Sequence, residues 1–380
     1  MGYCKNYKKG EKMIGLFLKL PAYWFFRAIG KPVLLPFNYT FSVTYRCNSK
    51  CKTCNIWRIQ QNIPFNLEMK TEEWMEIIKS LGNVPFWITI SGGEPFLRRD
   101  IVEIIKYIAK FNRPEIINIP TNGVLTSTSG KIEEILEIIK DLRTKLVINY
   151  SIDGIGNEHD GIRGVRGNWE KVVDNYWRTA ELKEKYCNLV LGIHTVISKW
   201  NVKRLPEISR ILIEEFKPDQ YITEIAEERI EMENFERKPT PNVTDYEKAI
   251  NFLINEIRVN MEKGWWKGLA KITEAFRLEY YRYVRDLYSG RDDSMKSYAG
   301  FATCQISPIG DVWECAVYAS NMGNLRDFDY DFKKLWNSKR AWEVRRKVKR
   351  EHKCPLANEA YANMLLSPMV ALRVVKKVLR

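Results

Sequence analysis

From residue 38 onward, short apolar runs alternate with longer stretches in which apolar residues recur every three or four positions. The short runs have the length and β-branched content of strands, and the longer stretches have the period of amphipathic helices. We therefore expect helices between strands along this part of the chain. The expected strands are residues 39–45, 86–90, 115–120, 146–153, 189–197 and 220–226.

Strand–helix alternation predicts parallel strands joined by right-handed crossovers. Several of the runs are apolar throughout, which is typical of a sheet covered on both faces. Six strands are fewer than the eight of a closed barrel. The pattern predicts an α/β fold built on a partial (β/α)6 barrel, with a doubly wound sheet as the alternative.

The pattern changes after residue 226. A charged loop is followed by helices rich in Trp, Tyr and Arg, then by a hairpin expected to turn at Gly310–Asp311 and by a basic helix at 332–350. This divides the chain into five segments. They are a basic and aromatic N-terminal extension (1–37), the barrel (38–226), a loop and helical connection (227–298), a hairpin-plus-helix module (299–356) and a basic amphipathic tail (357–380).

The 380-residue composition, with 45% hydrophobic and 28% charged residues, is that of a soluble globular protein. We find neither the run of roughly 18 apolar residues that a membrane span needs nor a secretory signal. Eight cysteines, three of them clustered, indicate metal binding in a reducing compartment rather than a disulfide framework. We expect a cytoplasmic protein.

The net charge of +14 is concentrated at the ends of the chain. Residues 1–36 carry seven Lys or Arg against one acid, residues 339–353 eight against two, and residues 354–380 four against one. Basic ends suit an anionic membrane surface, RNA or an acidic partner, and they equally suit solvated helix faces. The aromatic N-terminal stretch favours a membrane interface over RNA.

The first expected strand leads into a loop with three cysteines. Cys47, Cys51 and Cys54 are spaced C-x3-C-x2-C, without a fourth cysteine nearby. A zinc site or a closed iron–sulfur cluster takes four ligands, so one position is left for a distant residue or a bound molecule. The chain shows no Walker A loop, dinucleotide fingerprint or nucleophile elbow, and none of His159, His194 and His352 forms a metal-binding pair.

More polar motifs follow the next expected strands, where the carboxyl ends of parallel strands form the active face. "SGGEP" supplies Gly92, Gly93, Glu94 and Pro95 after the second strand. Its glycines permit close backbone approach, and its carbonyls and carboxylate could accept hydrogen bonds from an ammonium group. An ordinary turn with Pro at the first helical position is the alternative.

The cysteine spacing and "GGEP" together resemble the signature of radical S-adenosylmethionine (SAM) enzymes. The resemblance implies that Cys47, Cys51 and Cys54 hold a [4Fe–4S] cluster whose open iron binds SAM. It also implies reductive cleavage of SAM to a 5′-deoxyadenosyl radical that abstracts hydrogen from a substrate. The electron donor would be a ferredoxin or flavodoxin. One departure is Thr53, where the family often has an aromatic residue beside the adenine, and Trp57 is the substitute we expect.

Other residues would complete the SAM site by the same resemblance. Asn122 and Ser151–Asp153 end the third and fourth strands and are expected near the ribose or the methionine carboxylate. Arg163 is a candidate carboxylate clamp. Each could instead cap a turn or a helix, and His194 is either a core histidine or a neighbour of the adenine.

The C-terminal module resembles the SPASM and twitch extensions of radical SAM enzymes, which hold auxiliary iron–sulfur clusters. Cys304, Cys315 and Cys354 are the expected ligands of an auxiliary [4Fe–4S] cluster. The fourth ligand is left open among His352, Cys187, Cys4 and the substrate. Buried cysteines that bind no metal are the alternative.

The sequence thus predicts a radical SAM enzyme acting on a peptide, a protein or a small metabolite, with its catalytic residues unassigned. A lipid or lipid-linked substrate at a membrane surface, reached through peripheral contact of the basic ends, is a second possibility. A non-catalytic zinc protein that binds nucleic acid is the alternative of another class. "SGGEP" between a strand and a helix argues against it, because a zinc module has no use for that motif.

Overall fold

One curved sheet organises the whole chain. The computed structural model describes residues 11–31, 34–264, 269–291, 295–351 and 353–379. Within them the strand order is β6-β5-β4-β3-β2-β1-β7-β8-β9. The strands are β1 (Asn38–Thr44), β2 (Trp87–Gly92), β3 (Ile116–Thr121), β4 (Lys145–Ser151), β5 (Leu189–Ile197), β6 (Gln220–Ile225), β7 (Thr303–Ile306), β8 (Asp311–Trp313) and β9 (Asn321–Asn324).

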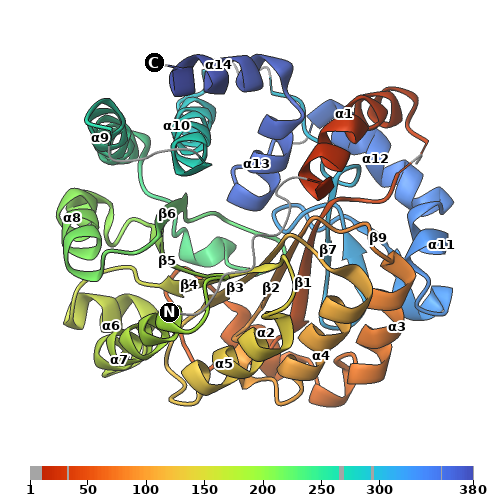
Figure 1. Cartoon of the computed structure of the whole chain (residues 1–380), viewed down its shortest axis with the longest axis horizontal. Coiled ribbons are helices and arrows are strands. Elements are labelled where there is room, and N and C mark those ends of the chain that lie inside the picture. Colours follow the sequence, from red (N-terminus) through yellow and green to blue (C-terminus); the bar gives the residue numbers. More distant parts are fainter. Residues whose placement is uncertain (1–10, 32–33, 265–268, 292–294, 352, 380) are drawn as a thin grey trace.

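Strands β1 to β6 are parallel and form the predicted partial barrel. The helices that follow the first five of them cover its outer side (Figure 1). They are α2 (Ile56–Asn62), α3 (Thr71–Leu81), α4 (Ile101–Tyr107), α5 (Thr128–Ile139), α6 (Asn157–Arg163), α7 (Asn168–Glu181) and α8 (Leu205–Phe216). The predicted fold class is confirmed.

The remaining helices lie over the other side of the sheet and at its β9 edge (Figure 1). They are α1 (Glu11–Ile29), α9 (Val243–Glu262), α10 (Leu269–Tyr288), α11 (Phe332–Trp336), α12 (Lys339–Glu351), α13 (Ala357–Leu365) and α14 (Pro368–Leu379). The expected basic helix at 332–350 is two helices. Its break falls at Asn337 and Ser338, because the Ser338 hydroxyl accepts a hydrogen bond from the Ala341 N–H and caps α12.

The hairpin of the C-terminal module is not separate from the barrel. Strand β7 pairs in parallel with β1, and β8 and β9 continue the same sheet antiparallel. The β7–β8 turn comes at Gly310, whose φ of +94° is a conformation that glycine adopts without strain. The pairing brings the module's cysteines to the edge of the barrel that carries the three-cysteine loop.

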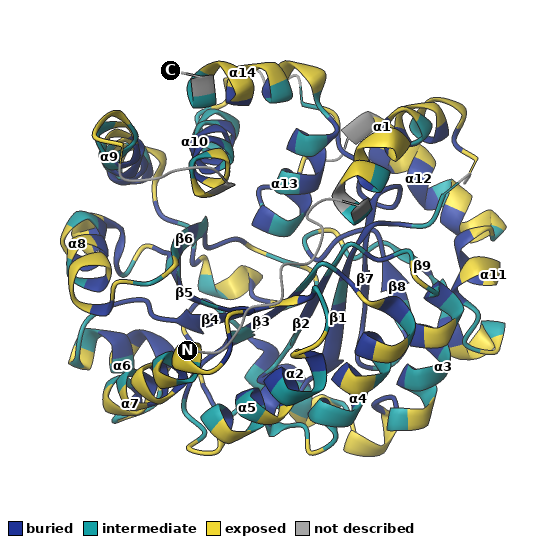
Figure 2. Cartoon of the chain, in the orientation of Figure 1, coloured by how far each residue is buried: buried dark blue, intermediate teal, exposed yellow. Residues whose placement is uncertain are grey.

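The two faces of the barrel sheet differ in polarity, whereas we expected several of its strands to be apolar throughout. The outer face buries apolar side chains against the helices, and Figure 2 shows the strands almost wholly buried. Each fully buried Ile or Leu there contributes about 1.5–3 kcal/mol. The inner face carries a polar row instead. Asn118 joins Thr89 and Asn149, and Asn149 accepts a hydrogen bond from Gln220 across β5.

Gly192 makes the hydrogen bond between Gln220 and Asn149 possible. It lies on β5 between Asn149 and Gln220 in the strand register. A Cβ atom at position 192 would stand 2.1 Å from Asn149 Oδ1. The inner face is therefore a hydrogen-bonded floor, and the space above it is free to receive a ligand.

Candidate active site

A cavity of about 300 Å³ opens above this floor, at the carboxyl ends of the strands. The cysteine loop, the "SGGEP" turn and the ends of β3, β4 and β5 border it on the barrel side. Residues of the C-terminal module, including Cys315 and Glu359, border it on the other side. Residues of both predicted groups thus line one cavity, whereas Pro95, Asp153 and Cys354 are not among its lining residues.

Cys47, Cys51 and Cys54 all line this cavity. Burial raises the pKa of the Cys54 thiol to about 12 and shifts the pKa of Cys47 and Cys51 in the same direction. The three thiols are therefore neutral until a metal replaces their protons. Two hydrogen-bond donors already face the sulfurs, since Asn122 Nδ2 lies 3.9 Å from Cys47 Sγ and Arg163 Nη1 lies 3.8 Å from Cys51 Sγ.

The loop's shape is fixed by backbone contacts. The Lys50 and Lys52 N–H groups donate to the carbonyls of Arg163 and Ile162. This crossing is close, because a Cβ atom at Gly164 would lie 2.3 Å from the Lys50 carbonyl oxygen. The "GIRG" stretch after β4 therefore serves as a support on which the cysteine loop rests.

The "SGGEP" turn passes directly against the start of the cysteine loop. The Gly93 N–H donates to the Thr44 carbonyl at 2.7 Å, and the Glu94 N–H donates to the Arg46 carbonyl at 2.8 Å. Pro95 opens a short 3₁₀ turn (Pro95–Leu97), as its preset φ favours. The two motifs are thus one connected backbone unit.

Glu94 is fully buried, and burial raises its pKa. Its carboxylate accepts hydrogen bonds from the Phe96 N–H, the Thr121 hydroxyl and the Asn122 N–H. Three of its roughly four acceptor positions are therefore used inside the protein. The side chain acts mainly as a positioning group that ties β2 to β3.

Arg163 and Asp153 are paired with each other in the wall of the cavity. Arg163 Nε lies 2.8 Å from Asp153 Oδ2, and Asp153 Oδ1 accepts from the Val196 N–H. Both side chains are buried. Arg163 Nη2 is also buried and has no hydrogen-bond partner among the described residues. It is the free donor that a bound acceptor would satisfy.

We expect Arg163→Gln to lower the free energy of unfolding by about 3–5 kcal/mol, because it leaves the buried Asp153 carboxylate without its partner. The matched control is Arg204→Gln, since Arg204 is exposed and pairs with Glu158 and Glu207 at the surface. Surface pairs of this kind are worth about 0–1 kcal/mol. Urea unfolding followed by circular dichroism compares the two. Equal losses would mean that the buried pair is not structural.

The module's cysteines are only partly brought together. The Cys315 and Cys354 side chains are hydrogen-bonded to each other. On β7, Thr303 bonds Glu359 and Gln305 bonds Ser42, both on the inner side. Because side chains alternate along a strand, the Cys304 thiol points to the outer face, although its residue borders the cavity.

Cys187 does not supply a further ligand for an auxiliary site. It precedes β5 and so lies at the amino ends of the strands, whereas the cavity lies at their carboxyl ends. Cys4 and His352 lie outside the described residues. Burial raises the pKa of both the Cys315 and the Cys354 thiol. Nearby carboxyl groups act in the same direction, Glu314 on Cys315, Glu227 on Cys354 and Glu359 on both. The described part of the chain thus offers two facing thiols with several carboxyl groups near them.

Two family models match the chain. One, described as the radical SAM superfamily, matches residues 41–211, and the SPASM model, an iron–sulfur cluster-binding domain, matches residues 298–357. This chain is a radical SAM enzyme with a SPASM domain. It therefore uses a [4Fe–4S] cluster and SAM, and its SPASM domain implies auxiliary iron–sulfur binding. The non-catalytic zinc alternative has no support.

Curated relatives of this radical SAM enzyme have varied names. Pre-heme d1 synthase of Dinoroseobacter shibae is 29% identical over 203 residues, covering 53% of this chain and 45% of the relative. The subtilosin biosynthesis protein AlbA of Bacillus subtilis is 25% identical over 338 residues, covering 85% and 66%. AdoMet-dependent heme synthase of Methanosarcina barkeri is 24% identical over 325 residues, covering 81% and 83%. The chain spans less than half of the first relative and about two thirds of the second.

Solved structures share the fold. Streptococcus suis SuiB bound to SAM gives a TM-score of 0.58 at 16% identity, covering 83% of this chain and 68% of that one. The enzyme anSMEcpe with bound AdoMet gives 0.59 at 20% identity, covering 84% and 82%. At such identities the likeness establishes the architecture of this radical SAM enzyme and nothing finer.

The barrel residues fit a cluster and SAM on chemical grounds. Donors from Asn122 and Arg163 suit thiolate or inorganic sulfur. The unpartnered Arg163 Nη2 suits an additional acceptor. Ser151 lines the cavity at the end of β4. Trp57, expected near the adenine, instead stacks with Arg58 and Arg237.

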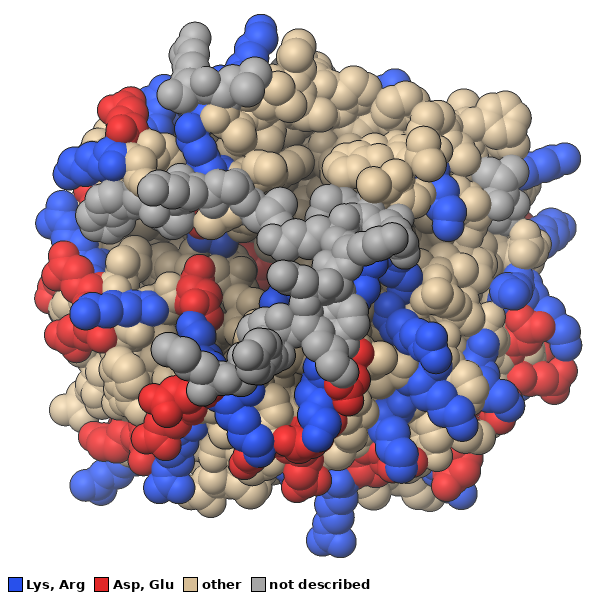
Figure 3. Space-filling model, in the orientation of Figure 1, with Lys and Arg blue, Asp and Glu red and all other residues tan. Residues whose placement is uncertain are grey.

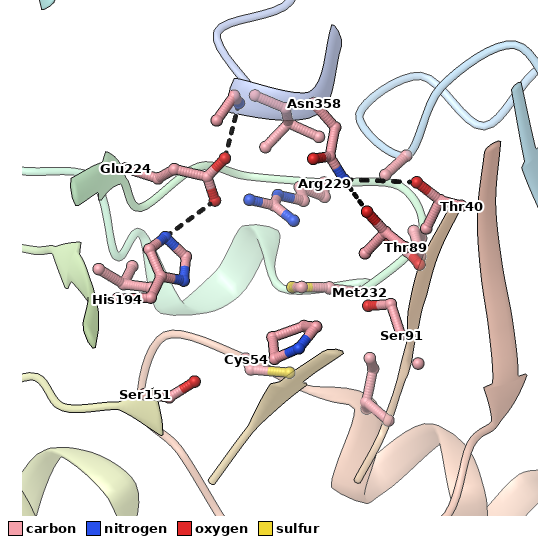
Figure 4. A pocket seen from close by; sticks show the side chains of 18 of the residues that line it. Thr40, Cys54, Thr89, Ser91, Ser151, His194, Glu224, Arg229, Met232 and Asn358 are labelled. Carbon is pink, nitrogen blue, oxygen red and sulfur yellow. Dashed lines mark hydrogen bonds and ion pairs between the residues drawn. The ribbon is translucent and has the colours of Figure 1, made fainter. Parts of the chain in front are cut away.

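Our sequence reading missed a polar cluster opposite the cysteine loop (Figure 4). His194 lines the cavity, with its Nε2 3.2 Å from Glu224 Oε2. Glu224 also accepts a 2.6 Å bond from the Ala357 N–H. Burial acts to raise the pKa of Glu224, but these partners prevail and lower it to about 2. His194 and Glu224 both face inward on neighbouring strands, so alternation along β5 and β6 could have indicated the pair.

The segment after β6 closes the cavity from above. Glu227, Arg229, Glu231 and Met232 all line it. The segment is tied to the cysteine loop, because Asn234 Nδ2 donates to the Thr53 carbonyl and Asn55 Nδ2 to the Glu233 carbonyl. The Ile230 N–H also donates to the Val317 carbonyl in the SPASM domain. The segment thus bridges the two halves of the site.

Proposed function

We propose that this enzyme modifies a peptide by hydrogen abstraction inside the shared cavity. Cys47, Cys51 and Cys54 would ligate the radical SAM cluster. Gly92, Gly93, Glu94, Pro95, Asn122, Ser151, Asp153 and Arg163 would hold or position SAM. Together the cluster and SAM supply a 5′-deoxyadenosyl radical that abstracts hydrogen from the substrate. The observation that carries the proposal is the single cavity bordered by both the cysteine loop and the SPASM domain.

The proposed division of labour follows the same boundaries. Residues 38–226 would form the SAM-cleaving barrel, residues 227–298 its connection, and residues 299–356 the auxiliary module, with 1–37 and 357–380 as flanking segments. Cys315 and Cys354 are the proposed auxiliary ligands. Cys304 would join them only if β7 turned its thiol inward. A ferredoxin or flavodoxin is the proposed electron donor.

A peptide substrate is favoured by the carboxyl groups of the cavity wall. Six acids line the cavity, and they are Glu94, Glu224, Glu227, Glu231, Glu314 and Glu359. Arg163 and Arg229 line the cavity beside these acids. Burial raises the pKa of Glu227 and Glu359 to about 7, whereas the partners of Glu224 lower its pKa to about 2 although burial acts to raise it. The wall therefore offers both protonated carboxyl groups, which can donate to peptide carbonyls, and a carboxylate, which can accept from backbone N–H groups. AlbA, a bacteriocin biosynthesis protein, and PqqA peptide cyclase are among the relatives.

The test uses deuterium as a label for the abstracted hydrogen. Reconstituted enzyme, SAM and dithionite are incubated anaerobically with peptide, small-metabolite or lipid fractions from perdeuterated cells of the source organism. We expect deuterium in 5′-deoxyadenosine with the peptide fraction, and loss of that signal when the fraction is first treated with protease. Labelling by the metabolite or lipid fraction alone would reject the peptide substrate while leaving the SAM-cleaving activity intact.

A further inference from the structure

Helix α1 is apolar on both of its faces. One face is buried against the barrel and the SPASM domain through Leu16, Leu20, Tyr23 and Phe26. The opposite face points to solvent and carries large apolar side chains that are 45–77% exposed. They are Ile14, Phe17, Leu18, Phe25 and Ile29. A surface helix normally shows polar residues on that side, and α1 shows apolar ones there.

Helix α14 extends the same apolar surface. Met369, Leu372 and Val375, spaced three residues apart, are 51–56% exposed on it. The Trp24 indole N–H donates to the Leu366 carbonyl at 2.8 Å, which fixes α1 beside the α13–α14 corner. Figure 1 places α1 and α14 along the same side of the molecule, and Figure 3 shows mostly uncharged side chains there. Large exposed apolar side chains gathered on two neighbouring helices mark an interaction site.

The charges on these helices indicate which partner covers the surface. Lys19 and Lys376 are exposed on α1 and α14, and the two helices contain one acid, Glu11. Arg373 is also exposed on α14, where it pairs with Glu279 of α10 at 3.2 Å. Lys12 and Arg27 are instead turned into the protein, where they donate to backbone carbonyls. An apolar stripe with a basic rim complements an anionic lipid surface. The same rim would repel a second copy of itself across a two-fold axis.

We propose that α1 and α14 dock this enzyme on the surface of an anionic membrane. The two helices would lie in the interface with their apolar side chains among the acyl chains and their basic side chains at the headgroups. Among the described residues, no helix is both long enough and apolar enough to cross a bilayer. The proposed contact is peripheral, and it is independent of which substrate the cavity accepts.

The test is flotation of the reconstituted enzyme with vesicles of phosphatidylcholine and phosphatidylglycerol at 3:1, compared with phosphatidylcholine alone. The variants are Phe17→Ser/Leu18→Ser/Phe25→Ser for the apolar stripe and Lys19→Gln/Lys376→Gln for the rim. Ile213→Ser is the matched control, because Ile213 is an exposed apolar residue on α8. SAM cleavage, measured as 5′-deoxyadenosine, reports that each variant is folded.

We expect the triple serine variant to lose at least about tenfold of its affinity for anionic vesicles. At low salt we expect the rim variant to bind anionic vesicles more weakly than wild type does. At high salt the two should bind equally, because salt screens the charges. Ile213→Ser should bind as wild type does. Absence of wild-type binding, or equal binding by the triple variant, would overturn the proposal. The proposal would also be overturned if light scattering showed a dimer for wild type and a monomer for the triple variant. The surface would then join two copies of the chain.

Discussion

Replacing Cys47, Cys51 or Cys54 by alanine is expected to abolish cleavage of SAM. Each substitution removes one of three thiols that the structure places on a single loop of the cavity. A cluster with only two protein ligands is not retained, so 5′-deoxyadenosine formation should fall at least about a hundredfold, or about 2.7 kcal/mol in the barrier. Iron should fall by about four atoms per chain. Anaerobic assays with dithionite, together with iron and sulfide analysis, measure both effects.

Two comparison variants separate this loss from general damage. Lys52→Ala changes an exposed side chain in the same loop and should retain both iron and activity. Cys315→Ala should lower the iron content without removing the barrel cluster, because Cys315 belongs to the SPASM side of the cavity. Normal SAM cleavage by any one of the three loop variants would defeat the assignment of Cys47, Cys51 and Cys54.

Gly93→Ala is expected to have the second largest effect on SAM cleavage. A Cβ atom at position 93 would lie 2.2 Å from the Arg46 carbonyl oxygen and 2.6 Å from its carbonyl carbon. Both obstacles are backbone, so the "SGGEP" turn or the start of the cysteine loop must move. A forced shift of this kind typically costs 1–3 kcal/mol, and we expect a loss of at least about tenfold in activity from misplaced SAM ligands.

The matched control is Gly130→Ala in α5, where an added Cβ atom meets nothing within 4 Å. Alanine is the better helix former by about 1 kcal/mol, so this variant should be as stable as wild type or more stable. SAM cleavage and thermal unfolding are measured on both variants. If Gly93→Ala cleaved SAM as fast as Gly130→Ala, the contact between the two motifs would not matter for the reaction.

The sequence predicted the barrel strands to within two residues, because their β-branched runs and the helices between them are strong local patterns. The difference in polarity between the two faces of the sheet was visible in the strand sequences, but we did not predict it. In "NYTFSVT" every second residue is polar, and these residues form the inner face of β1. The chemistry-bearing motifs were also visible, since close spacing along the chain places Cys47, Cys51 and Cys54 on one loop.

Long-range placement was not readable from local patterns. Cys304 and Cys315 are near in sequence, yet strand alternation sends the Cys304 thiol to the outer face. Cys354 meets Cys315 only because α12 returns the chain to the cavity. The contact of Glu224 with Ala357 joins residues 133 positions apart. Such pairs depend on how β7 docks on β1, which no single stretch of sequence encodes.

The two-sided sheet has a consequence for where an unpaired electron can settle. The rings of Tyr39, Phe41 and Tyr150 lie on the outer face, packed against other rings and helix residues. The inner face beneath the cavity presents amide and hydroxyl groups, which are much harder to oxidise than a phenol. The sheet thus separates these three rings from the cavity in which we propose that the radical forms. The Tyr288 hydroxyl, by contrast, donates to Glu227 in the cavity wall. A tyrosyl signal seen by electron paramagnetic resonance during turnover would then report on the bound substrate or on Tyr288 rather than on the strands that form the floor.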